Sequence, residues 1–264
     1  MHFTKMHGLG NDYLYVYGEV PPDVEDLSIR LSDRHFGAGS DGMIYISPSE
    51  VADFKMRIFN ADGSEAMMCG NGIRCVGKYV YEKGLTTRTT LAIETLSGVK
   101  SLDLQVEDGV VRTVSVGMGR AVVDEDLGLS VGDTNLVCTP VHVGNPHAVV
   151  FVKDAEAAAV ATLGPLVERH VAFPGGVNVE FVQVLSKEGL RMRVWERGSG
   201  ITMACGTGAC ASTAAAVSKG FCPPGPTITV HLDGGPLQVV VGGDGHVTMT
   251  GPAETVYEGE VTSC

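Results

Sequence analysis

The sequence predicts an α+β protein made of two pseudo-symmetric domains that arose by internal duplication. The stretch at 56–84 reads MRIFNADGSEAMMCGNGIRCVGKYVYEKG, and its counterpart at 192–220 reads MRVWERGSGITMACGTGACASTAAAVSKG. The two align without a gap at an offset of 136 residues, since 205 − 69 = 136 for the shared cysteine. Each stretch opens as an alternating strand, passes a Gly/Ser loop and continues with helical spacing. We therefore expect each domain to be mostly antiparallel strands wrapped around one helix.

In the first half, periodicity and stop signals locate the elements. Helices are expected at 23–35 and from Ile73 to the glycine stop at Gly84. Strands are expected at 1–7, 13–17, 43–47, 54–58, 91–95, 99–107 and 110–118.

The second half repeats this plan. Helices are expected at 155–170 and 210–220, and the second of these is Ala-rich and apolar nearly all round, as a helix enclosed by a sheet must be. Strands are expected at 136–143, 148–152, 179–185, 190–195 and 252–261. Residues 124–133 are polar and are predicted to lack a strand, so the boundary is placed just before them, giving domains 1–117 and 118–251.

Cys69 and Cys205 occupy equivalent points, each directly before a Gly-x-Gly helix start. Unpaired N–H groups and the helix dipole favour an anion there, so we expect a lowered thiol pKa and a docking place for a substrate carboxylate. Pseudo-symmetry would bring the two helix starts face to face across one cleft. The alternative is that both are buried, inert small side chains. A metal site is disfavoured, because the neighbouring cysteines lack the spacing of a zinc knuckle.

Composition limits the class of partner. The net charge of −12 argues against a nucleic acid or an anionic membrane, since both need a positive protein face. Seven cysteines, an odd number, and a first segment MHFTK without an apolar signal core predict a reduced, cytoplasmic protein. No apolar run approaches the ~18 residues that a membrane span needs.

Four motifs together resemble the diaminopimelate epimerase family. They are KMHGLGNDY at 5–13, FNADGSEAMMCGNGIRC at 59–75, GNPH at 144–147 and ERGSGITMACGTGACA at 196–211. The resemblance implies two similar domains, each a strand barrel around a central helix, with the active site in the cleft between them. It also implies that the tail at 252–264 returns to the first domain and that the enzyme is a homodimer.

The implied reaction explains why two cysteines are needed. Removing an amino-acid α-hydrogen requires a base held in contact, and inverting the centre requires an acid on the opposite face. As the resemblance implies, Cys69 and Cys205 supply these groups without pyridoxal phosphate or another cofactor. The reaction is the interconversion of LL- and meso-2,6-diaminopimelate, in lysine and peptidoglycan precursor synthesis.

Matched positions imply roles for further residues. Backbone N–H groups would hold the carboxylate at the reacting carbon, at Gly70, Asn71, Gly206 and Thr207. Side chains would hold the amino groups and the distal carboxylate, at Asn11, Asn60, Asn145, Asn178, Glu196 and Arg197. The cysteine pKa values would be tuned by His147 and Glu196. The resemblance also implies a substrate-contacting glutamine at the position of Gly42, so a backbone group or water would have to replace that side chain here.

Alternatives remain open for the residues and for the reaction. His147 could be purely structural, and Arg197 could serve only to ion-pair with Glu196. A proline or hydroxyproline racemase would resemble this scaffold, but it would have His in place of Asn71 and Asp-Arg-Ser-Pro in place of the motif at 196–199. A non-catalytic anion-binding protein of the same fold would have no reason to keep both thiols.

Overall fold

The computed structural model describes residues 1–262, and these residues form two compact units. Unit 1 consists of Met1–Val116 and the returning segment 251–262, and unit 2 consists of Gly117–Thr250. The observed division lies one residue from the predicted domain boundary. Ser263 and Cys264, the end of the predicted returning tail, lie outside the described residues.

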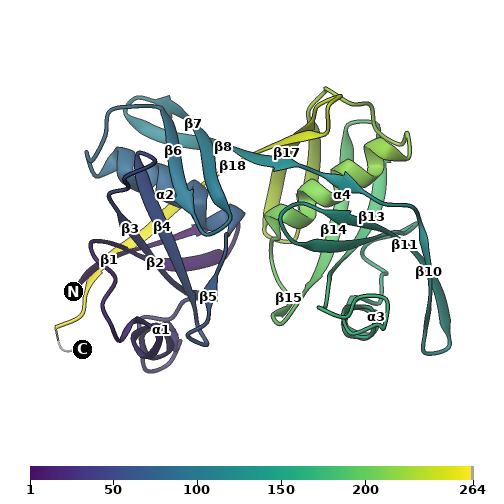
Figure 1. The fold of residues 1–264 in the computed structure, drawn as a ribbon, viewed down its shortest axis with the longest axis horizontal. Coiled ribbons are helices and arrows are strands. Elements are labelled where there is room, and N and C mark those ends of the chain that lie inside the picture. The colour runs from purple at the N-terminus through teal and green to yellow at the C-terminus, as the bar shows by residue number, and fades with distance from the viewer. Residues whose placement is uncertain (263–264) are drawn as a thin grey trace. The chain divides into compact units, whose positions relative to one another are not determined.

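In unit 1 the strands pair in the order β19–β1–β2–β3–β4–β6–β7–β8, and most of them are labelled in Figure 1. Most neighbours are antiparallel, whereas β2–β3 and β4–β6 are parallel. The elements are β1 (His2–Gly8), β2 (Asn11–Tyr17), α1 (Val24–Ser32), β3 (Gly42–Ser47), β4 (Phe54–Asn60), β5 (Glu65–Ala66), α2 (Gly70–Glu82), β6 (Thr90–Thr95), β7 (Gly98–Glu107), β8 (Val110–Arg120) and β19 (Glu254–Glu260).

Unit 2 repeats this topology, with its strands paired in the order β10–β11–β12–β13–β14–β16–β17–β18. The parallel pairs β12–β13 and β14–β16 correspond to the parallel pairs of unit 1, which confirms the predicted duplication. The elements are β9 (Val122–Val123), β10 (Leu127–Val131), β11 (Thr134–His142), β12 (Pro146–Phe151), α3 (Val160–Glu168), β13 (Asn178–Ser186), β14 (Gly189–Glu196), β15 (Gly200–Ile201), α4 (Gly206–Ser218), β16 (Ile228–Leu232), β17 (Gly235–Val241) and β18 (His246–Gly251).

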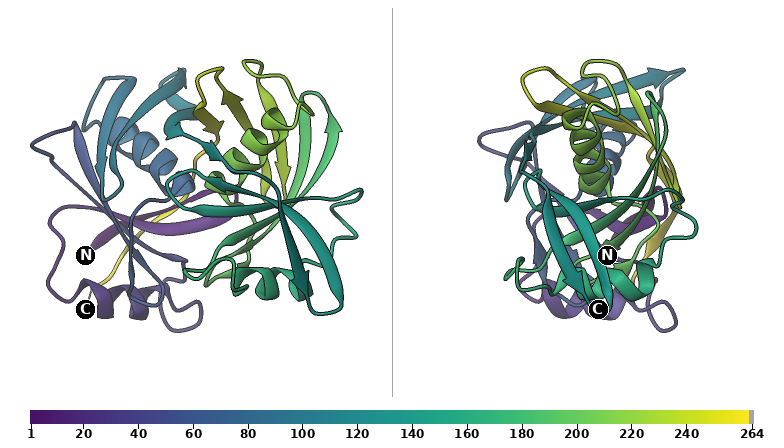
Figure 2. Two further views of the ribbon diagram at one scale, coloured as in Figure 1. Left: turned by 45° about the vertical axis from the view of Figure 1, so that its right-hand side comes forward. Right: turned by 90° about the vertical axis from the view of Figure 1, so that its right-hand side faces the viewer.

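One long helix packs against the strands of each unit, α2 in blue and α4 in green in Figure 2. In unit 1, α2 lies so close to β7 that a Cβ on Gly77 would be 2.9 Å from Leu102 Cδ2. In unit 2, nearly every residue of α4 from Gly206 to Ala216 is buried, as its apolar sequence predicts. The small side chains of α4 allow strands to approach it from several sides.

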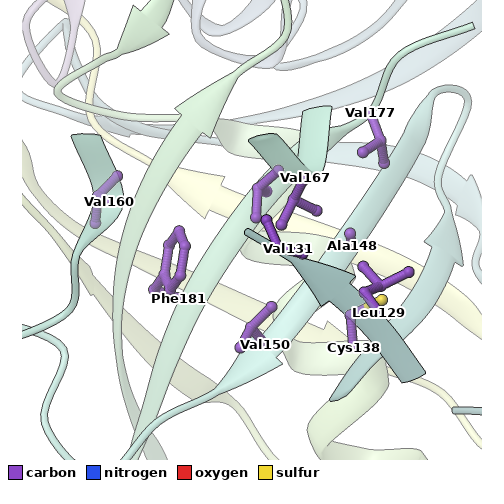
Figure 3. Close-up of a cluster of buried hydrophobic side chains, with 10 residues drawn as sticks. Leu129, Val131, Cys138, Ala148, Val150, Val160, Val167, Val177 and Phe181 are labelled. Carbon is purple, nitrogen blue, oxygen red and sulfur yellow. The ribbon is translucent and has the colours of Figure 1, made fainter. Parts of the chain in front are cut away.

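Residues 124–133 contradict the prediction, because they contain the strand β10. Leu129 and Val131 alternate inward and are 2% and 3% exposed. Their cluster includes Val150 and Phe181, which Figure 3 shows beside them. The apolar residues of this strand alternate with Gly128 and Ser130, and acidic residues flank the strand, so the overall polarity of the segment hid the alternation.

The helices predicted at 23–35 and 155–170 are both shorter in the structure. Helix α1 ends at Ser32, because the side chain of Asp33 accepts the backbone N–H groups of His35 and Phe36 and turns the chain away. Helix α3 begins only at Val160. Asp154 similarly accepts the N–H groups of residues 156 and 157 and holds the preceding segment in a turn. Within the described chain, no helix combines the length and apolar character required to cross a membrane.

Candidate active site

Cys69 and Cys205 are the N-cap residues of α2 and α4, as the sequence predicts. Each backbone is extended, and each Sγ accepts the N–H of the residue three positions on, Gly72 or Gly208, at 3.3 Å. The glycines allow close packing beneath the caps. A Cβ on Gly72 would lie 2.6 Å from Ile44 Cδ1, and one on Gly208 would lie 2.7 Å from Glu180 Oε1. We call the surroundings of Cys69 half-site 1 and those of Cys205 half-site 2.

Half-site 1 is built around the side-chain amide of Asn11, at the start of β2. Its Oδ1 accepts from Cys69 Sγ at 3.3 Å and from Asn71 Nδ2 at 3.4 Å, and its Nδ2 donates to Asp41 Oδ2 at 2.8 Å. Asp41 is held in turn by Arg34 Nη2 at 2.8 Å. These bonds fix which end of the amide faces the sulfur. The sequence prediction included Asn11 but not Asp41 or Arg34.

Half-site 2 contains a continuous polar chain that ends at Cys205. His147, at 1% exposure, has Nδ1 2.7 Å from Glu180 Oε1 and Nε2 2.9 Å from Asn145 Oδ1. Asn145 Nδ2 donates to Thr207 Oγ1 at 3.3 Å, and that hydroxyl is 3.6 Å from Cys205 Sγ. The parallel pairing of β12 with β13 brings His147 and Glu180 together.

The expected lowering of both thiol pKa values is wrong for Cys205. Burial raises the pKa of the Cys205 thiol well above its ordinary value, and the nearby carboxylates of Glu196 and Glu180 add to the effect. Glu196 is half-buried and accepts hydrogen bonds from Thr202 and Cys205, and its partial burial raises the pKa of its carboxyl group. The N–H groups of the helix start are therefore outweighed in half-site 2 by desolvation and two carboxylates.

Three other predicted ligands lie at the ends of β4, β13 and β14. Asn60 Nδ2 donates to Ser64 Oγ at 3.1 Å. Asn178 Oδ1 accepts the backbone N–H of Arg197 at 2.9 Å, which ties the ends of β13 and β14 together. The Arg197 guanidinium donates to Gly175 O at 3.0 Å. Within residues 1–262 it forms no ion pair with Glu196, so the purely structural alternative for Arg197 lacks its expected contact.

The helix starts offer backbone donors for an anion. Among the described residues, the N–H groups of Gly70, Gly206 and Thr207 have no hydrogen-bond partner, as expected for the first turn of a helix. At Gly42, in contrast, a Cβ would lie 2.2 Å from Phe59 O. Packing against β4 thus excludes any side chain at the position where the resembled family often has glutamine.

Sequence reasoning missed Glu180, although the duplication contains a signal for it. Subtracting the offset gives 180 − 136 = 44, and Ile44 is a fully buried residue at the same place in β3. In the alignment of the two copies, a glutamate at 180 therefore matches an isoleucine at 44, at an inward-facing strand position. A charged residue where the other copy has an apolar one is the signal that sequence reasoning could have used. Across residues 1–262, no group of three His, Cys, Asp or Glu side chains is arranged to hold a metal ion.

Sequence comparisons match nearly the whole chain to one protein family. A sequence model of the family "Diaminopimelate epimerase" matches residues 3–123 and 139–256. The chain is 48% identical over 279 residues to the diaminopimelate epimerase of Methanococcus maripaludis strain S2, with 99% of each covered. It is 50% identical over 277 residues to the diaminopimelate epimerase of Geobacillus kaustophilus, with 97% of this chain and 95% of the relative covered.

Solved structures share the fold at low sequence identity. A phenazine biosynthesis protein of the PhzF family from Bacillus anthracis aligns with a TM-score of 0.79 at 17% identity, covering 100% of this chain and 99% of the other. A probable proline racemase from Agrobacterium radiobacter aligns with a TM-score of 0.77 at 20% identity, covering 99% and 92%. At such identities these likenesses show the two-domain α+β fold alone.

Proposed function

Because the chain belongs to the diaminopimelate epimerase family, we propose that it interconverts LL- and meso-2,6-diaminopimelate by a two-thiol mechanism without a cofactor. The observation that carries the proposal is the repeated N-cap cysteine, Cys69 on α2 and Cys205 on α4, each beside unpaired helix-start N–H groups. We assign the reaction to lysine and peptidoglycan precursor synthesis. We also propose that the enzyme is cytoplasmic and forms a homodimer.

The two thiols divide the work of inversion. One cysteine removes the α-proton as a thiolate, and the other delivers a proton to the opposite face of the same carbon as a thiol. In the reverse direction the roles exchange. The mechanism therefore requires unit 1 to supply one thiol and unit 2 the other.

The substrate α-carboxylate is assigned to the helix starts. Backbone N–H groups at Gly70, Asn71, Gly206 and Thr207 supply fixed partial positive charge, which also stabilises negative charge that spreads from the α-carbon into the carboxylate when the proton leaves. This electrostatic stabilisation takes the place of an electron-withdrawing cofactor.

The remaining polar side chains are assigned to the distal end of the substrate and to the thiols. The guanidinium of Arg197 matches a carboxylate with two parallel bonds, and its position fixed through Asn178 supports a role at the second carboxylate. The amino groups are assigned to Asn11, Asn60, Asn145, Asn178 and Glu196. His147 and Glu196 are assigned to tuning the thiols.

The experiment follows stereochemistry and α-deuterium together when the enzyme is incubated with either isomer in D₂O. The wild type is expected to invert the centre with incorporation of solvent deuterium. Cys69→Ala and Cys205→Ala should each lower inversion at least about a hundredfold, since a two-base reaction has no substitute for either partner. Cys222→Ala removes a buried thiol outside both half-sites and should retain wild-type activity.

Two outcomes would contradict the proposal. Near-normal inversion by a folded Cys69→Ala or Cys205→Ala variant would exclude the two-thiol mechanism. Inversion of proline by the wild type at a rate similar to that of diaminopimelate would assign the scaffold to the racemase class. Lysine, which lacks the second carboxylate, should be a poor substrate.

A further inference from the structure

Glu180 is a fully buried carboxylate with an incomplete set of hydrogen bonds. It lies on β13 with 0% exposure, and its Oε1 is 2.7 Å from Nδ1 of His147. Its Oε2 has no hydrogen-bond partner among the residues that the structure describes. Burying a carboxylate without satisfying both oxygens is costly, so its presence calls for a reason other than packing.

The duplication shows that the fold does not need a carboxylate at this place. Ile44 occupies the equivalent position of β3 and is also fully buried. Both side chains lie under a helix cap: Ile44 Cδ1 is the nearest atom to a Cβ built on Gly72, and Glu180 Oε1 is the nearest to one built on Gly208. Unit 1 thus completes the same packing with an apolar side chain.

The partner of Glu180 is also specific to unit 2. His147 corresponds to Asn11 of unit 1, since 147 − 136 = 11. The acid–imidazole pair is therefore present in one copy of the repeat and replaced at both positions in the other. Two changed residues that contact each other at 2.7 Å form one feature of half-site 2.

The surrounding hydrogen bonds define how the imidazole is held. Asn145 Oδ1 lies 2.9 Å from Nε2 of the ring, and Asn145 Nδ2 is hydrogen-bonded to Thr207 Oγ1 at 3.3 Å. The 2.7 Å separation between Nδ1 and Glu180 Oε1 is a hydrogen bond, so one hydrogen lies between these two atoms. Because both nitrogens are hydrogen-bonded, the orientation of the ring is fixed.

We propose that Glu180 is a positioning residue of the active site, which fixes the ring and the proton of His147 and, through Asn145 and Thr207, the polar groups beside Cys205. The proposal rests on the function proposed above, because its consequence is read in the epimerisation rate. Glu180 has no exposed surface and cannot touch substrate. Its loss should therefore lower mainly kcat through His147, with a smaller change in KM through Asn145, which is assigned to the substrate amino groups.

Two substitutions test this role in the full-length enzyme. Glu180→Ile introduces the residue that unit 1 carries at this place, so it should pack, but it leaves Nδ1 without an acceptor. Glu180→Gln keeps an oxygen acceptor and removes the charge. We expect kcat to fall at least about tenfold in Glu180→Ile and less in Glu180→Gln, with KM within about twofold of wild type. The control is Glu188→Gln, an exposed residue in the β13–β14 turn.

A nuclear magnetic resonance measurement tests the pair without any turnover. In enzyme labelled with ¹⁵N-histidine, the Nδ1–H signal of His147 is assigned by its absence from His147→Asn. We expect this signal in the wild type and in Glu188→Gln, a changed shift in Glu180→Gln, and loss of the signal by solvent exchange in Glu180→Ile.

The two measurements separate the possible failures. Wild-type kcat in folded Glu180→Ile, or an unaltered His147 signal in that variant, overturns the positioning role. If Glu180→Ile does not fold, Glu180→Gln decides: wild-type kcat with an unchanged signal overturns the proposal. If the wild type does not epimerise diaminopimelate, the proposed function fails, whereas the resonance still reports whether Glu180 holds His147.

Discussion

At the scale of single residues, the two half-sites differ in the charges that surround the sulfur atoms. The side chains hydrogen-bonded around Cys69 include the neutral amides of Asn11 and Asn71, whereas Cys205 lies near two carboxylates. The duplicated N-caps are therefore alike in geometry and unlike in electrostatics. A reaction whose two directions start from different isomers has no need for identical thiols.

This difference predicts the ionisation of Cys205. Because burial, Glu196 and Glu180 raise its pKa, the thiol should be protonated at neutral pH and should become a thiolate only as the pH rises above the ordinary range for cysteine. Alkylation of Cys205 by iodoacetamide, followed by peptide mass mapping from pH 7 to 10, should show this alkaline midpoint. Glu196→Gln removes a nearby negative charge and should move the midpoint to lower pH.

The pH midpoint is the decisive quantity in that experiment, because burial slows alkylation at every pH. Glu188→Gln serves as the control that leaves the midpoint in place. A Cys205 midpoint at or below that of an unfolded cysteine would contradict the expected effect of the two carboxylates.

The structural environment of a residue could be predicted from the sequence where it depends on a local pattern. The cysteines precede Gly-x-Gly in both copies, and the N-cap geometry follows from that local signal. The contact of Glu180 with His147 depends on the parallel register of β12 and β13, between strands 33 residues apart in the sequence. Periodicity locates each strand but does not give its neighbours or register, so this contact could not be derived.

At the scale of elements, the cysteines have a second function as helix caps. Each Sγ accepts an N–H at 3.3 Å in the first turn of its helix. Both helices are buried along most of their length, so their starts cannot be satisfied freely by water. Loss of a cap should therefore cost stability independently of any loss of activity.

The prediction is that serine and alanine substitutions separate these two functions. Cys69→Ser and Cys205→Ser keep a capping oxygen, whereas the alanine variants remove the cap. The serine variants should be more stable than the alanine variants by about 1 kcal/mol, and all four should lack epimerase activity. Urea unfolding followed by circular dichroism measures the stability. Equal midpoints within each Ser/Ala pair would show that the sulfur bond contributes nothing to the helix.

Element boundaries show where sequence signals are weakest. Helix α4 was predicted from a uniformly small, apolar run and is buried as expected. Helices α1 and α3 were predicted too long, because aspartate side chains at 33 and 154 form local turns that compete with helix formation. Strand β10 was not predicted, because the burial of Leu129 and Val131 depends on their packing in the cluster with Phe181, which is distant in the sequence.

At the scale of the whole molecule, unit 1 is completed by the end of the chain. Strand β19 pairs antiparallel with β1 along His2–His7, as the yellow and purple ribbons of Figure 1 show. Arg74 of α2, fully buried, donates from Nε to Pro252 O at 3.1 Å. At Gly259 a Cβ would lie 2.4 Å from Phe3 Cζ, so the strand packs directly on an aromatic ring.

Truncation before β19 should therefore loosen unit 1 and spare unit 2. A chain that ends at Gly251 leaves β1 as an open edge, and hydrogen exchange at the β1 amides should accelerate at least about tenfold. The amides of α4 should exchange as in the full-length protein. A chain that ends at Glu260 keeps the strand pairing and is the control. Unchanged protection of β1 in the shorter chain would contradict this role of β19.

Because unit 1 is formed by two separate parts of the chain, the two units complete their sheets at different times during translation. Unit 2 is one unbroken segment, Gly117–Thr250, and can acquire its complete sheet while the ribosome still holds the chain. Unit 1 begins first but must wait for its last strand, so the open edge of β1 persists through nearly the whole of translation. A nascent chain halted after unit 2 would carry one finished half-site and an unfinished partner, which makes it a natural substrate for chaperones and degradation.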